Sequence, residues 1–377
     1  MVGMLTEVRN LYQRHARSIF DEGMFRGAWS LAAVAMSVNA ACINFRPPPA
    51  PLAEAHTANA PEEAWSVDGG RGATGPMETD GRHVYLGGAD RQVRAIDLET
   101  GAETWHRRLT GTVLGGVLLR DSTLFLATSR PQGRVLALDQ LTGRDRWTAS
   151  SGDISTPLAI SSGLVAGMNR RGELVASDIE TGTIRWRRKL GLSRLPPLPL
   201  ADGFLVATAD SILRVEASAG RMVQGKALRT APISWQLAGN RILIASGDSS
   251  VTALGRADLA QHWRTVLDGP LLGSIAVNAD TLWGVTRVGT VYEVLMSRDT
   301  AAARVVAALR IPVTSGVSRL DDLLVIGGAD GVLRGLNRNG DSQWRVNLSW
   351  NITVPPIAVP DGFVAVGGDG DLYRFIR

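Results

Sequence analysis

From Trp65 onward, apolar and polar residues alternate in short runs, and glycine, aspartate and asparagine residues separate these runs. One full set is "HVYLGG" (83–88), "VRAIDL" (93–98), "AETWHRRL" (102–109) and the more apolar "TVLGGVLLRD" (112–121). Alternation with a period of two residues is typical of half-buried β-strands, and short polar turns between strands are typical of antiparallel hairpins. The pattern therefore predicts units of four short antiparallel strands, in which the last of these runs is the innermost strand of the next unit.

One motif marks these units and recurs about every 40 residues, with some copies weaker than others. It is "AIDLETGAETW" at 95–105, "ALDQLTGRDRW" at 137–147 and "ASDIETGTIRW" at 176–186. Degenerate copies are expected near Val223 and Val305, where the spacing between the tryptophans doubles. The tryptophans of the repeat are Trp65, Trp105, Trp147, Trp186, Trp263 and Trp344. A repeat of this length predicts a propeller or a solenoid, in which each unit covers the apolar face of its neighbour.

Eight pairs of middle strands can be counted along the chain. They lie near 83–97, 123–138, 163–178, 203–216, 241–254, 281–294, 323–336 and 363–376. The last pair has no outer strand after it, whereas "EEAWSV" (62–67) is an outer strand with no unit before it. The sequence thus predicts an all-β fold, an eight-bladed β-propeller of four-stranded antiparallel blades whose ring is closed by pairing of the N- and C-terminal strands.

Two residue types of the motif are expected to carry its packing role. The glycines of the Thr-Gly pairs, Gly101, Gly143 and Gly182, are expected to take a positive φ in a tight turn. The tryptophans are expected to cover the seam between adjacent blades with a large ring area. The aspartates fall mostly in the turns of the repeat, and we interpret them as turn-capping residues.

Composition and charge narrow the class of protein. The 377 residues are 45% hydrophobic and 20% charged, which is typical of a globular chain that buries a core. The formal net charge is +4, but the arginines are scattered among acidic residues, with one cluster at Arg185, Arg187, Arg188 and Lys189. A nucleic-acid-binding surface needs a basic stripe interleaved with aromatic residues, so we expect no nucleic acid among the partners.

Candidate catalytic chemistry is sparse in this sequence. The five histidines show no pairing at i, i+3 or i+4, so no zinc ligand set is predicted. No Gly-x-Ser-x-Gly nucleophile motif is present. Cys42 is the only cysteine, which excludes an intrachain disulfide and a CxxC site. We therefore predict no catalytic residue, no metal site and no enzyme.

The N-terminal region resembles a secretory signal. In residues 24–42, a basic residue precedes a run of small and apolar residues that ends in Ala-Ala-Cys. This ending is similar to a bacterial lipobox, so Cys42 is predicted to be lipidated, although Asn39 stands where that pattern prefers leucine. Two interpretations of residues 1–23 stay open: translation begins at Met24, or these residues extend the signal on its cytoplasmic side.

The signal, a linker and the repeats suggest three parts. Residues 43–64 are rich in proline and alanine without an apolar period, and we interpret them as an extended tether. The predicted parts are an N-terminal extension with signal peptide (1–42), the tether (43–64) and the propeller (65–377). A lipid, a tether and a folded body indicate a membrane-attached periplasmic protein, with either the outer or the inner membrane as the site of the anchor.

The motif A-x-D-x-x-T-G-x-x-x-W, present at 95–105 and 176–186, resembles the tryptophan-docking repeat of the pyrroloquinoline-quinone-like β-propellers. The resemblance covers about 65–377. Quinoprotein dehydrogenases of this family carry a vicinal disulfide, a calcium site and an Asp base, whereas this chain has no second cysteine. The vicinal disulfide of those enzymes is therefore absent, and no catalytic Asp is assigned. A quinoprotein-like enzyme or ligand binder that uses the central funnel is kept as an alternative function.

The chain is more similar to the BamB family of lipoproteins. The resemblance rests on size, on eight blades, on the order lipid, tether and propeller, and on the ending Asp369-Gly370-Asp371-Leu372-Tyr373 with Arg377. It implies a non-catalytic scaffold without a cofactor in the outer-membrane β-barrel assembly machinery, with a membrane-embedded barrel protein as its partner. A scaffold subunit of another cell-envelope complex is the further alternative.

The BamB resemblance also implies a partner-binding loop. In that family, a loop after one tryptophan-bearing strand carries leucines and an arginine, and the matching segment here is "LGLSRLPPLPL" (190–200), after Trp186. The predicted contact residues are Leu192 and Arg194, with Leu190 and Leu195 beside them. The last two leucines are equally compatible with ordinary packing at a strand end. The family also uses an acidic loop one blade later, whereas residues 224–235 contain no acidic residue.

Overall fold

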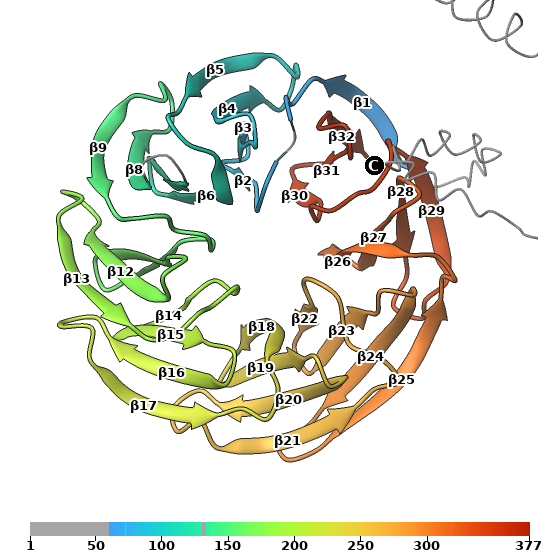
Figure 1. Ribbon diagram of the computed structural model, residues 1–377. Coiled ribbons are helices and arrows are strands. Elements are labelled where there is room, and N and C mark those ends of the chain that lie inside the picture. Colours follow the sequence, from blue (N-terminus) through green and yellow to red (C-terminus); the bar gives the residue numbers. More distant parts are fainter. Residues whose placement is uncertain (1–59, 72, 130–132) are drawn as a thin grey trace, which may run out of the picture. The chain divides into compact units, whose positions relative to one another are not determined.

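The computed structural model describes residues 60–71, 73–129 and 133–377. Within these ranges, 32 strands form eight four-stranded antiparallel sheets, and no helix is present. The sheets are arranged as blades around a centre (Figure 1). The predicted eight-bladed β-propeller is therefore confirmed. The predictions for Cys42 and Met24 lie outside the described residues.

The first four blades follow one another along the chain, each from its inner to its outer strand. Blade 1 has β2 (Glu78–Thr79), β3 (His83–Gly87), β4 (Gln92–Asp97) and β5 (Glu103–Arg108). Blade 2 has β6 (Val113–Arg120), β7 (Thr123–Thr128), β8 (Arg134–Asp139) and β9 (Asp145–Ser150). Blade 3 has β10 (Ala159–Ser161), β11 (Leu164–Met168), β12 (Glu173–Asp178) and β13 (Ile184–Lys189). Blade 4 has β14 (Leu198–Leu200), β15 (Gly203–Ala207), β16 (Ser211–Glu216) and β17 (Met222–Ala227).

Blades 5 to 7 repeat this order, and blade 8 combines both ends of the described chain. Blade 5 has β18 (Pro232–Ala238), β19 (Arg241–Ser246), β20 (Ser250–Gly255) and β21 (Gln261–Val266). Blade 6 has β22 (Ala276–Asn278), β23 (Thr281–Val285), β24 (Thr290–Met296) and β25 (Ala301–Ala308). Blade 7 has β26 (Val313–Leu320), β27 (Leu323–Gly328), β28 (Val332–Leu336) and β29 (Ser342–Asn347). Blade 8 has β30 (Ile357–Val359), β31 (Gly362–Val366), β32 (Leu372–Ile376) and β1 (Glu62–Val67).

Blade 8 closes the ring because its outer strand comes from the N-terminal end of the described chain. In the antiparallel pair of β1 and β32, Trp65 faces Arg374 and Val67 faces Leu372. Figure 1 shows the blue β1 at the outer edge of the red blade 8. The predicted ring closure is confirmed. The strand begins at Glu62, so ordered β-structure starts slightly before the Trp65 boundary that the motif predicts.

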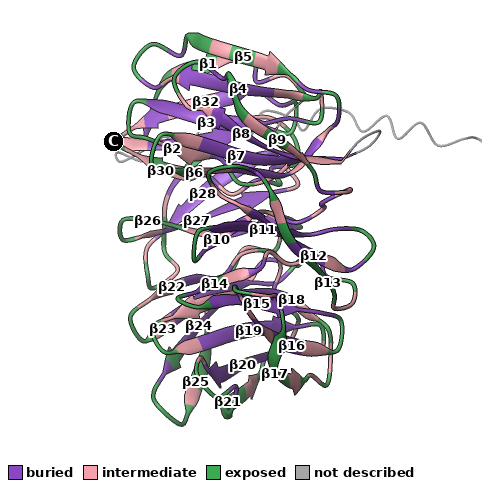
Figure 2. Cartoon of the chain, turned by 90° about the vertical axis from the view of Figure 1, so that its left-hand side faces the viewer, coloured by how far each residue is buried: buried purple, intermediate pink, exposed green. Residues whose placement is uncertain are grey.

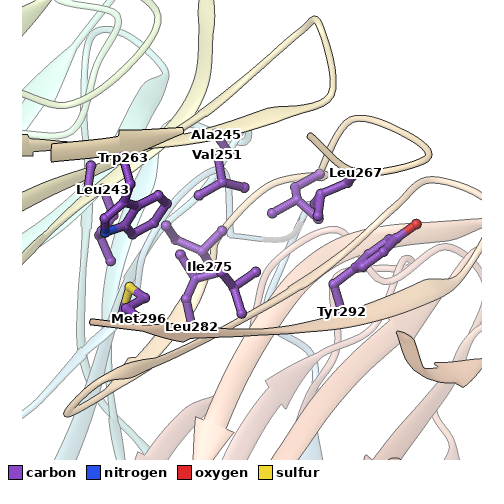
Figure 3. Close-up of a cluster of buried hydrophobic side chains, with 12 residues drawn as sticks. Leu243, Ala245, Val251, Trp263, Leu267, Ile275, Leu282, Tyr292 and Met296 are labelled. Atoms are coloured by element: carbon purple, nitrogen blue, oxygen red, sulfur yellow. The ribbon is translucent and has the colours of Figure 1, made fainter. Parts of the chain in front are cut away.

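Burial follows the position of a strand within its blade. The middle strand β3 is buried along its whole length, whereas the outer strand β5 alternates between exposed and half-buried residues (Figure 2). The buried side chains form clusters that join adjacent blades. In one cluster, Leu243 and Val251 of blade 5 pack with Leu282 and Met296 of blade 6 (Figure 3). Each blade therefore buries an apolar face against its neighbour, which it could not do alone.

Four of the repeat tryptophans join neighbouring blades through a hydrogen bond. Their indole N–H groups donate to a backbone carbonyl in the outer hairpin of the next blade, whereas Nε1 of Trp263 has no hydrogen-bond partner among the described residues. The pairs are Trp65 with Leu98 (2.9 Å), Trp105 with Gln140 (2.9 Å), Trp147 with Ile179 (2.9 Å) and Trp186 with Ala217 (2.7 Å). Because a buried indole N–H needs an acceptor, this bond fixes where the ring lies on the next blade.

The turn glycine of the same hairpin lies under the tryptophan ring. Gly101, Gly143 and Gly182 have φ values of 72°, 66° and 72°. A Cβ atom on these glycines would approach the rings of Trp65, Trp105 and Trp147 to 2.9, 2.6 and 2.5 Å, respectively. Both the backbone angle and the close approach therefore require glycine at this place in the motif.

The aspartate of the motif caps the same turn. In blade 3, Oδ1 of Asp178 accepts hydrogen bonds from the backbone N–H and the hydroxyl of Thr181, at 2.9 and 3.0 Å. Its Oδ2 accepts a 2.7 Å hydrogen bond from Arg185. The hydrogen bonds from Arg185 and Thr181 lower the pKa of Asp178 to about 2. These contacts agree with a turn-capping role for the motif aspartates.

In blade 4, glutamine replaces the tryptophan, one residue after the predicted Val223. Gln224 faces Arg214 and Met222 faces Val215, so Val223 is the extra residue of a β-bulge and its side chain is exposed. Gln224 Nε2 donates a 2.6 Å hydrogen bond to the carbonyl of Asp258 in the next blade. The amide thus makes the same link between blades as the indole N–H does elsewhere, without the ring area.

Candidate partner-binding surface

The predicted partner-binding loop joins β13 of blade 3 to β14 of blade 4, and its side chains alternate between exposed and buried. Leu192 is 66% exposed, Ser193 is buried and Arg194 is exposed. Leu190 packs against the core cluster of blades 3 and 4, and Leu195 packs against the cluster of blades 4 and 5. The loop therefore exposes Leu192 and Arg194, while the other two leucines contact the interior.

Backbone hydrogen bonds hold this loop at both ends. The N–H groups of Leu190 and Gly191 donate to the carbonyl of Gly172 in the β11–β12 turn, at 2.9 and 3.1 Å. At the other end, the indole of Trp235 in blade 5 donates a 2.9 Å hydrogen bond to the carbonyl of Pro196. The loop thus presents its exposed side chains from a fixed position between three blades, which lowers the entropy cost of binding.

A polar hollow of about 470 Å³ lies beside the β11–β12 turn, between blades 2 and 3. Its lining residues are Gly133, Gly152, Asp153, Asn169, Arg170, Arg171, Glu173 and Arg187. Arg187 donates to the carbonyls of Ser150 (2.7 Å) and Ser151 (2.9 Å), which ties blade 3 to the end of blade 2. This hollow was not predicted from the sequence. The basic run in β13, which contributes Arg187 to the lining, is the feature of the sequence that points to it.

A partly buried polar cluster joins blades 1 and 2 around Asp80. Its Oδ2 accepts hydrogen bonds from Tyr85 (2.8 Å) and Gln140 (2.9 Å), and its Oδ1 accepts one from the N–H of His83 (2.6 Å). Burial raises the pKa of Asp80, but hydrogen bonds from His83, Arg82 and Tyr85 outweigh it and lower that pKa to about 2. Because Tyr85 and His83 are buried, these contacts serve the joint between the blades.

Glu78 on β2, the inner strand of blade 1, has a pKa that burial raises from 4.5 to about 7. The folded state therefore binds this proton more tightly than the unfolded chain, and its stability falls as the pH rises from 4.5 to about 7. The full shift corresponds to about 3 kcal/mol, which partial exposure reduces to about 1–2 kcal/mol.

The substitution Glu78→Gln is accordingly expected to raise the free energy of unfolding by about 1–2 kcal/mol above pH 7, because it removes the penalty of a buried charge. Below pH 4.5 the two proteins should have nearly equal stability. Urea unfolding of both proteins on each side of this pH range measures the difference, and equal stability above pH 7 would contradict the expectation.

The described ranges contain neither a cluster of metal ligands nor a membrane-spanning helix. Within residues 60–71, 73–129 and 133–377, no group of three histidine, cysteine, aspartate or glutamate side chains is placed to hold a metal ion. None of these ranges contains a helix long and apolar enough to cross a membrane.

Sequence comparisons connect the repeats to known proteins. The family model described as outer membrane protein assembly factor BamB matches residues 53–195 and 131–235. The chain is 30% identical to BamB of Burkholderia pseudomallei over 175 residues, which cover 45% of this chain and 44% of the relative. It is 24% identical to BamB of Yersinia pestis over 322 residues, which cover 81% of this chain and 72% of that relative.

Structural comparisons agree on the fold. The crystal structure of BamB from Moraxella catarrhalis superposes with a TM-score of 0.70 at 19% identity and covers 84% of this chain and 97% of that one. The computationally designed Ika8 protein superposes with a TM-score of 0.72 at 14% identity and covers 84% and 100%. The blade-joining repeat, the matched family model and these relatives together identify the chain as a β-propeller with pyrroloquinoline-quinone-like repeats that resembles the BamB family.

Proposed function

We propose that this protein is a non-catalytic scaffold of the outer-membrane β-barrel assembly machinery, and that the loop between blades 3 and 4 binds a membrane-embedded barrel protein. The observation that carries the proposal is the fixed loop with Leu192 and Arg194 exposed on it, at the place that the BamB resemblance implies. The similarity to proteins named outer membrane protein assembly factor supports the choice of machinery. A rigid ring with a fixed binding loop is suited to hold one domain of a partner in place.

Substitution of the two exposed loop residues tests this function. We expect the double variant Leu192→Ser/Arg194→Ser to recover at least about tenfold less of the barrel-forming partner in affinity purification from native membranes, since a buried leucine contact and one charged hydrogen bond are each worth about 1–2 kcal/mol. The measurement is quantitative mass spectrometry of the purified material.

The matched control is Leu141→Ser. Leu141 is 64% exposed, but it lies in the β8–β9 hairpin of blade 2. This variant should recover as much partner as the wild type. Undiminished recovery with the loop variant, or recovery of a different envelope complex by the wild type, would remove the assignment.

The second part of the proposal is attachment to the outer membrane through a lipid on Cys42, with residues 1–42 as extension and signal, 43–64 as tether and 65–377 as folded body. Stable anchoring needs more than one acyl chain, which a lipidated N-terminal cysteine supplies. We expect Cys42→Ser to move the protein from the membrane fraction to the soluble fraction and to abolish incorporation of labelled palmitate. Label incorporated by the variant would contradict lipidation at this residue.

A further inference from the structure

Basic side chains gather around the β11–β12 turn of blade 3. The set consists of Arg170 and Arg171 in the turn, Arg187 and Lys189 on β13, and Arg194 in the loop. In the pairing of β12 with β13, Glu173 faces Lys189 and Val175 faces Arg187, so the two basic residues of β13 stand beside the end of the turn. Three segments that are separate in the sequence therefore place their cations on one part of the surface.

Most of these cations are not neutralised by carboxylates. Arg187 donates to two backbone carbonyls, and Lys189 donates to the carbonyl of Arg171. Among the described residues, neither Arg171 nor Arg194 forms an ion pair. Within the described part of the chain, only Arg170 of this set has an acidic partner, Asp153, at 3.3 Å.

Some other arginines of blades 3 and 4 instead face an acid. Arg185 pairs with Asp178 at 2.7 Å in the same blade, and Arg214 pairs with Asp202 at 3.0 Å in the next. A carbonyl acceptor orients a cation but leaves its net charge in place. The surface of blade 3 therefore keeps an excess of positive charge.

The β11–β12 turn contributes to the hollow and also contacts the proposed partner loop. Arg171 and Arg187 line the hollow. The Gly172 carbonyl accepts the N–H groups of Leu190 and Gly191, and a Cβ atom on Gly172 would lie 3.1 Å from the backbone nitrogen of Leu192. The turn is thus in contact with both the hollow and the loop.

We propose that this surface, formed by Arg171, Arg187, Lys189, Leu192 and Arg194, binds an acidic segment of a protein partner. Carboxylates of the segment would face the arginines and the lysine, and an apolar side chain would contact the exposed Leu192. The proposal rests on the proposed function and specifies the chemistry of the partner at the same site. Charge complementarity of this kind speeds association and selects among partners.

The surface fits an acidic protein segment better than a polyanion. The carboxylates of Asp153 and Glu173 also line the hollow, and they would repel a nucleic acid or a dense layer of anionic lipid. None of the described residues that line the hollow is aromatic, so bases would have no ring to stack on. A protein segment can place single carboxylates opposite the cations and leave uncharged groups opposite these two acids.

Fluorescence anisotropy with the purified full chain tests the inference. The probes are a short synthetic peptide in which glutamates flank a central leucine, and the same peptide with glutamines in their place. The test protein is Arg171→Glu/Arg194→Glu, whose two arginines form no ion pair with a described residue. The control is Arg298→Glu, an exposed arginine of the β24–β25 hairpin that also forms no ion pair in the described ranges.

We expect the glutamate peptide to bind the wild type and the control equally, and to bind the double variant at least about tenfold more weakly, because two favourable charge contacts become repulsive. Binding to the wild type should weaken as salt is added. No binding of the glutamate peptide to the wild type, equal binding of the two peptides, or equal affinity of all three proteins would overturn the inference. It would also be overturned if the double variant lost only binding to phosphatidylglycerol vesicles.

The single variant Arg171→Glu separates this inference from the proposed function. If Arg171→Glu recovers the barrel-forming partner from membranes as well as the wild type does, the acidic-segment inference fails and the assembly function stands. If binding of the glutamate peptide depends on Arg171 but the wild type recovers no barrel-forming protein, the assembly function fails and the acidic-segment inference stands.

Discussion

Replacing Trp186 with alanine is expected to lower the free energy of unfolding by about 3–5 kcal/mol. The side chain is 7% exposed and belongs to the core cluster that joins blades 3 and 4. Its indole donates to the Ala217 carbonyl, and its ring packs edge-on against Phe204 and covers Gly220. Alanine would open a cavity at the seam and leave that carbonyl without its indole donor. Chemical unfolding followed by circular dichroism measures the loss.

Two further variants show which contact is responsible. Trp186→Phe keeps much of the ring area and removes the indole N–H, so it should cost about 1–3 kcal/mol. Trp350→Ala is the control, because Trp350 is 61% exposed and should cost less than about 0.5 kcal/mol. An equal loss of stability in Trp186→Ala and Trp350→Ala would refute the role of the buried ring at the seam.

Removing β1 is expected to have a comparable or larger effect. A chain that begins at Asp68 lacks the outer strand of blade 8, leaves the outer edge of β32 unpaired and exposes the apolar cluster that Trp65 and Val67 help to cover. We expect it to lose about 5 kcal/mol of stability relative to a chain that begins at Ala60, from several backbone hydrogen bonds of about 1 kcal/mol each and the buried part of one tryptophan. The free edge should also promote aggregation.

Addition of the missing strand as a peptide provides the decisive measurement. A synthetic peptide of residues 60–67 should bind the shortened chain and raise its melting temperature further as the peptide concentration is increased. The same peptide with alanine in place of Trp65 should bind much more weakly, since it lacks the indole that donates to Leu98. A shortened chain as stable as the longer one would show that ring closure contributes little.

The number of blades and the ring closure could be predicted because their determinants are local. A period of two residues marks each strand whatever surrounds it. Gly143 has a φ of 66°, a conformation that favours glycine. The glycine in the sequence therefore indicates this turn without knowledge of the rest of the fold. The closure followed from simple counting, since the last pair of strands had no outer strand and residues 62–67 had no blade.

The replacement of tryptophan by glutamine in blade 4 was not visible in the sequence. A glutamine amide and an indole share only the ability to donate a hydrogen bond to the next blade. Whether Gln224 reaches the carbonyl of Asp258 depends on the β-bulge at Val223 and on the position of blade 5. A search for an aromatic residue at the tryptophan position of blade 4 therefore does not find Gln224.

The binding surface was likewise predictable from the sequence only in part. The sequence by itself determined the eight blades, the turns that need glycine, and a loop after Trp186 that carries leucines and an arginine. Only the tertiary structure decided that Leu192 and Arg194 are exposed while Leu190 and Leu195 pack inward, and that Arg171 and Arg187 line one hollow. The physical reason is that periodicity records how a single strand alternates, whereas proximity between segments depends on how successive blades pack around the ring.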